Sequence, residues 1–403
     1  MPVEFYLNIL LLFTLLSGVF FFKSIYLKFC VFVFFYPIVT LFCVKFNIPL
    51  FGIITAIGSK FFTQNIADYA YAWSITGYLV FISTLWSVRN QRIEFDTLKI
   101  NAETRLILLI CHAVFAIVAY PRAFYIADYR FNLLPGGGWA SIYSLFSILI
   151  ILSSKKKFSL IEIIHLAITF FVILGGERAD SMLILLFMLI YRGDEVKKEI
   201  RLNIKFFSIA TLSISFFLIV GAMRNKALDF LLNNYGDILP LVGTLLLTSL
   251  YNQQTVSDTT HVYLSSVWGY FNDQGSYMTL LNTPFTLFPM TPLGGATSPY
   301  YYQQWIYPYI PNAGGGLFYS EGALNFGLSG VIFYAFLLGF LIKKTLISKK
   351  LFGHLAFVAL FVLQMRIQWY GFLYMMKPFV LFYLFTLVYD LSRQGYFKKN
   401  ELH

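Results

Sequence analysis

Charged residues are scarce in this sequence. Asp, Glu, Lys and Arg make up 12% of the 403 residues, whereas soluble globular proteins contain about 25%. Hydrophobic residues make up 58% of the chain and lie in long blocks. Such blocks differ from the alternating pattern of a transmembrane β-barrel. Because a backbone in lipid must satisfy its own hydrogen bonds, these apolar blocks predict transmembrane helices.

Cysteines and metal-binding motifs are also scarce. Cys30, Cys43 and Cys111 all lie inside apolar blocks, and we expect small apolar side chains there rather than a disulfide framework or a metal site. The sequence has no Walker-type phosphate loop, His/Cys cluster, serine nucleophile elbow or Asp-x-Asp pair. We therefore expect chemistry that needs no metal or other cofactor and takes its energy from an activated substrate.

Twelve apolar blocks predict an all-α polytopic membrane protein. They divide the chain into N-terminal transmembrane helices at 1–221, a large loop at 222–325, and C-terminal helices with a tail at 326–403. The block at 46–59 is alternatively a re-entrant segment, which leaves eleven spans. The first block lacks the features of a removed signal peptide. The blocks are 5–22, 29–44, 46–59, 71–87, 106–119, 138–153, 158–174, 179–191, 203–221, 326–342, 351–365 and 373–390.

The net charge of +11 comes largely from short basic loops between the blocks. If the spans alternate in direction, five basic clusters fall on one side, which the positive-inside rule assigns to the cytoplasm. The positive net charge therefore gives no reason to expect a nucleic-acid partner. Twelve spans place both termini inside, and eleven place the N-terminus outside. The clusters are Arg89, Arg92, Lys99 and Arg105; Lys155–Lys157; Arg192, Lys197, Lys198 and Arg201; Lys343, Lys344, Lys349 and Lys350; and Arg393, Lys398 and Lys399.

Four arginines and a lysine lie on the opposite, outer side, where basic residues are few. A guanidinium group binds phosphate or carboxylate through two parallel hydrogen bonds, so these residues predict an anionic ligand. Alternatively, Arg178 forms an ion pair with a neighbouring acid, or these basic residues anchor the protein at the membrane interface. The candidates are Arg122, Arg130, Arg178, Arg224 and Lys226.

The loop at 222–325 is rich in tyrosine, tryptophan and proline. Aromatic rings with polar tips stack on sugars and donate hydrogen bonds, and closely spaced prolines predict a rigid, irregular lid. The alternative is an aromatic belt at the membrane surface. The candidate sugar-binding residues are Tyr301, Tyr302, Trp305, Tyr319 and Asn325.

A glycine-rich stretch, 311–321, ends in Glu321 and leads to the next apolar block. A carboxylate in a partly dry site can act as a general base, so Glu321 is the first candidate for that role. Its alternative role is at the start of a helix, as a cap or a favourable charge. His261 is the rival base, and its alternative role is an ordinary polar contact.

These features together resemble the O-antigen polymerase family. The resemblance rests on the outer Gly175–Arg178 turn, the late outer loop, and the stretch Gly314–Gly327. It implies an integral-membrane glycosyltransferase-like fold in the bacterial inner membrane. It also implies polymerisation, at the periplasmic face, of oligosaccharide repeat units linked to undecaprenyl pyrophosphate. The expected transfer is inverting and metal-independent, with lipid-linked donor and acceptor, membrane lipids and a chain-length regulator as partners.

Two other functions stay open from the sequence. A lipid-linked oligosaccharide flippase would have similar spans, although flippases favour short loops and charges buried in mid-span. An O-antigen ligase would have a similar overall pattern. An acyltransferase would show a histidine-centred signature, and His112, His165 and His354 lie in apolar blocks without one.

Overall fold

The computed structural model describes residues 3–48, 62–91, 93, 95, 98, 100–120, 137–154, 159–174, 179–195, 254–281, 301–312, 315–348, 350–371 and 379–390. Every regular element in these ranges is helical, which confirms the all-α prediction. The helices are α1 (Val3–Ser17), α2 (Ile25–Lys45), α4 (Gln64–Leu85), α5 (Ala102–Ala119), α6 (Gly137–Leu152), α7 (Leu160–Leu174), α8 (Ala179–Glu195), α12 (Gln254–Phe271), α13 (Tyr277–Leu281), α15 (Tyr302–Ile306), α16 (Ser320–Ile347), α17 (Leu351–Val362) and α18 (Gln364–Tyr370), the short 3₁₀ helices η1 (Gly18–Phe21) and η2 (Trp86–Val88), and a last helix at Phe379–Asp390.

Four of the described helices are long and apolar enough to cross a membrane. Five shorter apolar helices coincide with further predicted blocks. The predicted span at 203–221 lies outside the described residues. So does the block at 46–59 from residue 49 onward. The four long helices are Val3–Phe21, Ile25–Lys45, Ala102–Ala119 and Ser320–Ile347, and the shorter ones are Trp139–Leu152, Leu160–Ile173, Ser181–Tyr191, Leu351–Val362 and Phe379–Asp390.

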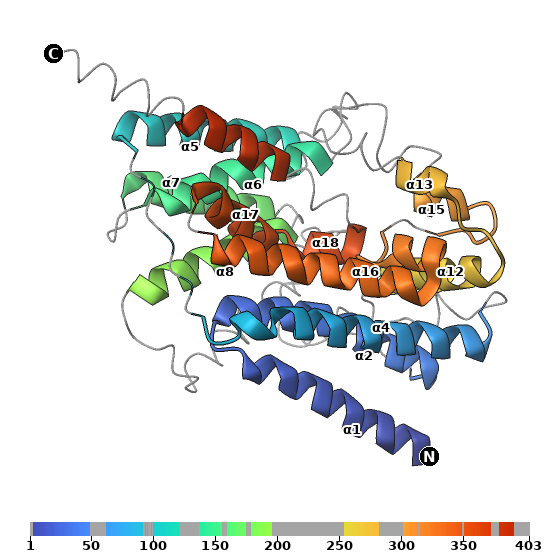
Figure 1. Ribbon diagram of the computed structural model, residues 1–403. Helices are drawn as coiled ribbons and strands as arrows, with labels where there is room; N and C mark the ends of the chain where they lie inside the picture. The colour runs from blue at the N-terminus through green and yellow to red at the C-terminus, as the bar shows by residue number, and fades with distance from the viewer. Residues whose placement is uncertain are drawn as a thin grey trace, which may run out of the picture.

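The long helices run roughly side by side in layers (Figure 1). α1 forms one edge, followed by α2 with α4, then α16 with α12, then α17, α18 and α8, and then α6 with α7. α5 and the last helix form the other edge. α16 packs on α4, α12 and α17, and α5 packs on α6 and α7. α16 therefore lies at the centre of the part of the fold that holds the late loop.

Lys45 joins three helices at one end of the bundle. Its Nζ lies 2.8 Å from Glu4 and 3.2 Å from Asp68, and Gln64 Nε2 donates to the Lys45 carbonyl oxygen at 3.0 Å. The start of α1, the end of α2 and the start of α4 therefore meet here, so these three helices alternate in direction. The helices on either side of the block at 46–59 are joined at the same end.

The opposite end holds several of the basic loops. Lys23 N donates to the Arg89 carbonyl oxygen at 2.8 Å, and Leu98 N donates to that of Leu152 at the same distance. Arg105, at the start of α5, forms an ion pair with Glu162, at the start of α7. α5, α6 and α7 therefore alternate in direction.

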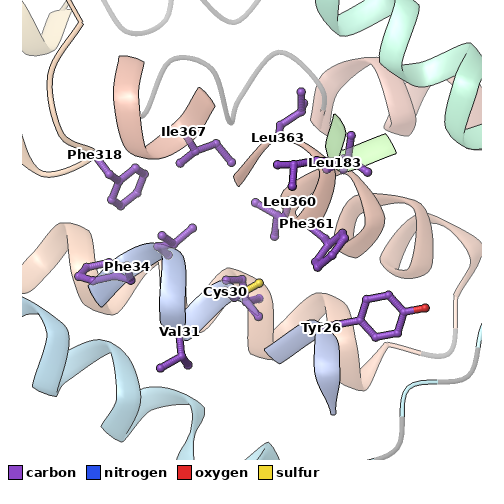
Figure 2. Close-up of a cluster of buried hydrophobic side chains, with 14 of the residues drawn as sticks. Tyr26, Cys30, Val31, Phe34, Leu183, Phe318, Leu360, Phe361, Leu363 and Ile367 are labelled. Atoms are coloured by element: carbon purple, nitrogen blue, oxygen red, sulfur yellow. The ribbon is translucent and has the colours of Figure 1, made fainter. Parts of the chain in front are cut away.

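An aromatic cluster fills this second end. The ring of Tyr26 lies 5.5 Å from Phe95, 6.1 Å from Phe187 and 5.2 Å from Phe361, centroid to centroid. Tyr26, Phe187 and Phe361 are almost completely buried. Figure 2 shows Tyr26 and Phe361 in a larger apolar cluster that also contains Cys30 and Phe34 of α2, Leu183 of α8 and Ile367 of α18. The bundle is therefore tightly packed between its middle and this end.

Two of the three cysteines are buried, as the sequence analysis expected. All three are free, with Cys30 and Cys43 buried and Cys111 half-buried. They act as small apolar side chains within helices.

Part of the predicted loop at 222–325 is a regular helix, α12, whereas most of the proline-rich stretch predicted to form an irregular lid lies outside the described residues. α12 is an 18-residue helix that packs on α2, α4 and α16. Thr260 Oγ1 lies 3.1 Å from Thr40 Oγ1 of α2, and Tyr263 Oη donates to the Ala70 carbonyl oxygen at 3.3 Å. The sequence obscured this helix because buried threonines and serines interrupt its apolar pattern.

α16 changes direction sharply at Gly327, where φ is 60° and ψ is −136°. A Cβ atom at Gly330 would lie 2.0 Å from the carbonyl oxygen of Gly322, so these two backbones touch across the turn. The first turns of α16 therefore fold back along the helix that follows. Glycine is required at these positions because no side chain fits between the two segments.

Gly330→Ala is expected to destabilise the protein. The added methyl group must push the two segments of α16 apart, and overpacking of this kind costs about 1–3 kcal/mol. Thermal unfolding of the detergent-solubilised protein measures the effect. Ser329→Ala, an exposed change in the same helical turn, is the matched control, and equal melting temperatures for the two variants would contradict the close Gly322–Gly330 contact.

Candidate functional site

The candidate site lies where the chain enters the bundle at 315–326. Tyr319 precedes α16 and donates from its Oη to Ser74 Oγ of α4 at 3.0 Å. Beyond the turn, a Cβ atom at Gly77 would lie 3.0 Å from Val331 Cγ1, and Gly77 lies in the middle part of α4. The folded-back turns of α16 therefore sit between the two ends of the bundle.

Glu321 is the acid at the centre of this site. It is only 5% exposed, and its Oε2 accepts a hydrogen bond of 3.2 Å from Tyr334 Oη. The two residues are 13 positions apart, and the turn at Gly327 brings them together. The carboxyl thus binds a phenol rather than capping the helix, although its place in the first turn still favours the helix dipole.

Tyr302 packs against the glycine-rich stretch beside Glu321. Its Oη donates to the Gly315 carbonyl oxygen at 3.2 Å and accepts from Gln303 Nε2 at 3.2 Å. A Cβ atom at Gly316, where φ is +128°, would lie 2.1 Å from this Oη. Burial, with further contributions from Tyr301 and Glu321, raises the pKa of the Tyr302 phenol well above its usual range. Tyr302 is therefore a neutral hydrogen-bonding group, and the glycines give it room.

The other predicted sugar-binding aromatic residues also have partners within the protein. Tyr301 and Tyr319 are buried, and the half-buried Trp305 donates from Nε1 to the Gln274 carbonyl oxygen at 3.0 Å. The most exposed tyrosines nearby are Tyr277, Tyr307 and Tyr309. These three could meet a ligand in solvent without any rearrangement.

Asn325 links α13 to α16. Its Oδ1 accepts from Ser276 N at 2.7 Å, and its Nδ2 donates to Thr279 Oγ1 at 2.9 Å and to the Glu321 carbonyl oxygen at 3.1 Å. Three hydrogen bonds occupy the amide. In this structure Asn325 therefore holds the site together, and its predicted role in sugar binding remains untested.

His261, the rival base, is on α12 and does not contact Glu321. Its half-buried ring packs edge-on against Phe62 at a centroid distance of 5.3 Å. Burial lowers the pKa of the imidazole, so the ring is neutral at neutral pH. The next residue, Val262, packs with Tyr301 and Tyr302. Glu321 therefore lies near Tyr302 and Tyr334, whereas the ring of His261 packs against Phe62.

The predicted anion-binding residues lie outside the described residues. They are Arg122, Arg130, Arg178, Arg224 and Lys226. Their proposed role remains a prediction from the sequence.

A second polar cluster is buried among α5, α6 and α7. The rings of His112 and His165 are 4.7 Å apart, and His165 Nε2 lies 2.6 Å from Ser147 Oγ. One turn before His165, Glu162 binds Arg105. The sequence analysis noted both histidines in apolar blocks but could not pair them, because only helix packing brings them together.

Comparison with known protein families, with curated proteins and with solved structures finds no match to this chain. The resemblance stated above therefore rests on the sequence motifs alone.

Tyr334→Phe is expected to lower the stability of the protein. It leaves the buried Glu321 carboxyl without its phenol donor, which costs about 1–3 kcal/mol. Glu321→Gln should cost less, because the amide oxygen can still accept that hydrogen bond. Thermal unfolding compares both with Tyr383→Phe, at a tyrosine that is 52% exposed. A Tyr334→Phe variant as stable as this control would show that the phenol–carboxyl bond contributes little.

Proposed function

We propose that this protein polymerises oligosaccharide repeat units linked to undecaprenyl pyrophosphate, as a glycosyltransferase at the outer face of the bacterial inner membrane. The observation that carries the proposal is Glu321, a carboxyl held on a folded-back, glycine-rich helical turn within an apolar bundle. Buried carboxyl groups in such a setting have functional roles more often than structural ones.

The proposed topology has eleven spans with the N-terminus outside. The junction of α2 and α4 at Lys45 supports the re-entrant interpretation of the block at 46–59. The basic loops near Arg89 and Arg105 would then face the cytoplasm. The long stretch from 222 to 325 would begin and end outside, and the segment before α16 would enter from there.

The proposed reaction transfers a glycan from one lipid carrier to a new unit. Glu321 accepts the proton of the acceptor hydroxyl as its oxygen bonds to the anomeric carbon of the donor glycan. The bond from that carbon to the pyrophosphate breaks, and undecaprenyl pyrophosphate leaves. Arg178 and Arg224 stabilise the charge that develops on the leaving group. The transfer inverts the anomeric configuration and leaves the donor lipid as product.

A flippase is the second candidate, and two observations favour it. Glu321 lies between the ends of the bundle, and His112 and His165 are completely buried within α5 and α7. Ionisable groups within membrane helices often mark transport paths. The aromatic cluster around Tyr26 argues against it, because it fills the bundle on the cytoplasmic side of the proposed topology.

Deleting the gene and separating the envelope polysaccharide on a gel distinguishes the functions. A polymerase deletion leaves lipid core with a single repeat unit and no ladder. A flippase deletion leaves core without repeat units and traps lipid-linked units inside the cell. Units that accumulate outside without reaching the core would indicate a ligase. An unchanged ladder would refute the proposal.

Arg178→Ala is expected to abolish long chains in the deletion strain while the protein still inserts in the membrane. Arg178→Lys should restore little, because a single ammonium group lacks the two parallel donors of guanidinium. The ladder gives the activity, and an immunoblot of the membrane fraction controls for insertion. A normal ladder with Arg178→Ala would remove this residue from the site.

Glu321→Gln is expected to retain binding of the lipid-linked donor and to lose turnover, because an amide cannot accept the proton. The measurement is polymer formed by the purified variant from extracted lipid-linked units, alongside binding of the same units. His261→Gln is the comparison variant and should remain active. The reverse result, an active Glu321→Gln and an inactive His261→Gln, would assign the base to His261.

A further inference from the structure

Two glutamines on α18 have no hydrogen-bonding partner among the residues that the structure describes. Gln364 and Gln368 are both completely buried, and neither the nitrogen nor the oxygen of either amide makes a hydrogen bond. They are four residues apart and so share one face of the helix. Buried amides without partners are costly in a folded protein, and each such group requires an explanation.

The packing of α18 against its neighbours does not explain why glutamines occupy these two positions. Ile367 of α18 and Leu363, just before the helix, pack in the apolar cluster with Phe318 (Figure 2). These apolar contacts already hold the helix in place. Leucine or methionine at 364 and 368 would extend the same packing without leaving polar atoms unpaired. The glutamines therefore lower stability in this state.

α18 is a short segment between two breaks in the helical path. It begins after the break at Leu363, which separates it from α17, and ends at Gly371, where φ is 84°. It contacts α2, α8, α12 and α17. Broken helices in membrane proteins are tolerated where they line a site or a cavity. The two breaks can also act as hinges that allow α18 to move relative to the helices around it.

The end of α18 adjoins the site of Glu321. A Cβ atom at Gly371 would lie 3.7 Å from the Oη of Tyr302, the phenol that packs on the glycine-rich stretch. Gln368 lies one helical turn before Gly371. The unpaired amides therefore belong to a helix that ends beside Tyr302, the phenol that packs on the stretch leading to Glu321.

We propose that Gln364 and Gln368 bind the hydroxyl groups of the glycan chain when α18 moves away from its neighbours. This inference rests on the proposed function and adds a sugar-binding pair to it. An amide both donates and accepts hydrogen bonds, as sugar hydroxyls do, whereas a pyrophosphate group requires cationic donors. A neutral amide pair thus suits the uncharged part of the substrate. Its unpaired state is the condition of the protein before the glycan binds.

The test replaces both glutamines with methionine, which has a similar length and no amide. The double variant Gln364→Met, Gln368→Met is expected to melt at a higher temperature than the parent protein without substrate. Gln303→Met is the matched control, because Gln303 is also buried but donates to Tyr302. Its melting temperature should fall.

Binding is measured with two probes. One is the undecaprenyl-pyrophosphate-linked repeat unit extracted from the deletion strain, and the other is undecaprenyl pyrophosphate without sugar. The double variant is expected to bind the sugar-bearing lipid at least about tenfold more weakly, the loss of a few hydrogen bonds. It should bind the sugar-free lipid as tightly as the parent protein.

Three results would overturn the inference. They are a lower melting temperature in the double variant, failure of both single methionine variants to fold, or unchanged affinity for the sugar-bearing lipid. The first two would mean that the amides have stabilising partners. Failure of the proposed function is distinguishable, because it appears as an unchanged ladder in the deletion strain. Glutamine-dependent binding of the glycan could still be observed in that case.

Discussion

The contact between the backbones of Gly322 and Gly330 is the constraint on which the site depends. It holds the first turns of α16 against the helix that follows, with Gly327 in a conformation that few other residues adopt. A straight helix would carry Glu321 about 20 Å from Tyr334 along its axis. Folding the helix back instead brings the carboxyl into hydrogen-bonding distance of that phenol. The position of the candidate base is therefore a property of the backbone.

The surrounding contacts all hold this folded-back segment in place. Tyr319 fixes its entry to α4 through Ser74, and Asn325 fixes its last turn to α13. The ring of Tyr270 covers Gly327, where a Cβ atom would lie 2.6 Å from its Cζ. A site built on so many short-range contacts keeps its geometry without a large domain around it, which is the condition for a preorganised carboxyl.

The sequence predicted the parts of this structure that depend on local composition. Apolar blocks predicted the helices. The sequence did not predict α12, because Thr260 is buried through a hydrogen bond to Thr40 of α2 that only the fold creates. Nor did it pair His112 with His165 or single out Gln364 and Gln368. Each of these features depends on which helix faces overlap, and apolar periodicity carries little of that information in helices that are apolar nearly all round.

The distribution of packing within the bundle bears on how a glycan could reach Glu321. Between the carboxyl and the end that holds Arg89, the aromatic cluster of Tyr26, Phe187 and Phe361 is almost completely buried. Passage of a hydrophilic chain through that region would expose several large rings at once, and each buries about 150–250 Å². Glycines and phenols surround the carboxyl, and α18, which carries the two amides, ends beside Tyr302. Opening α18 would create new hydrogen bonds for two amides that have none. Movement of α18 is therefore less costly than opening the aromatic cluster, which favours the proposed polymerase over a flippase.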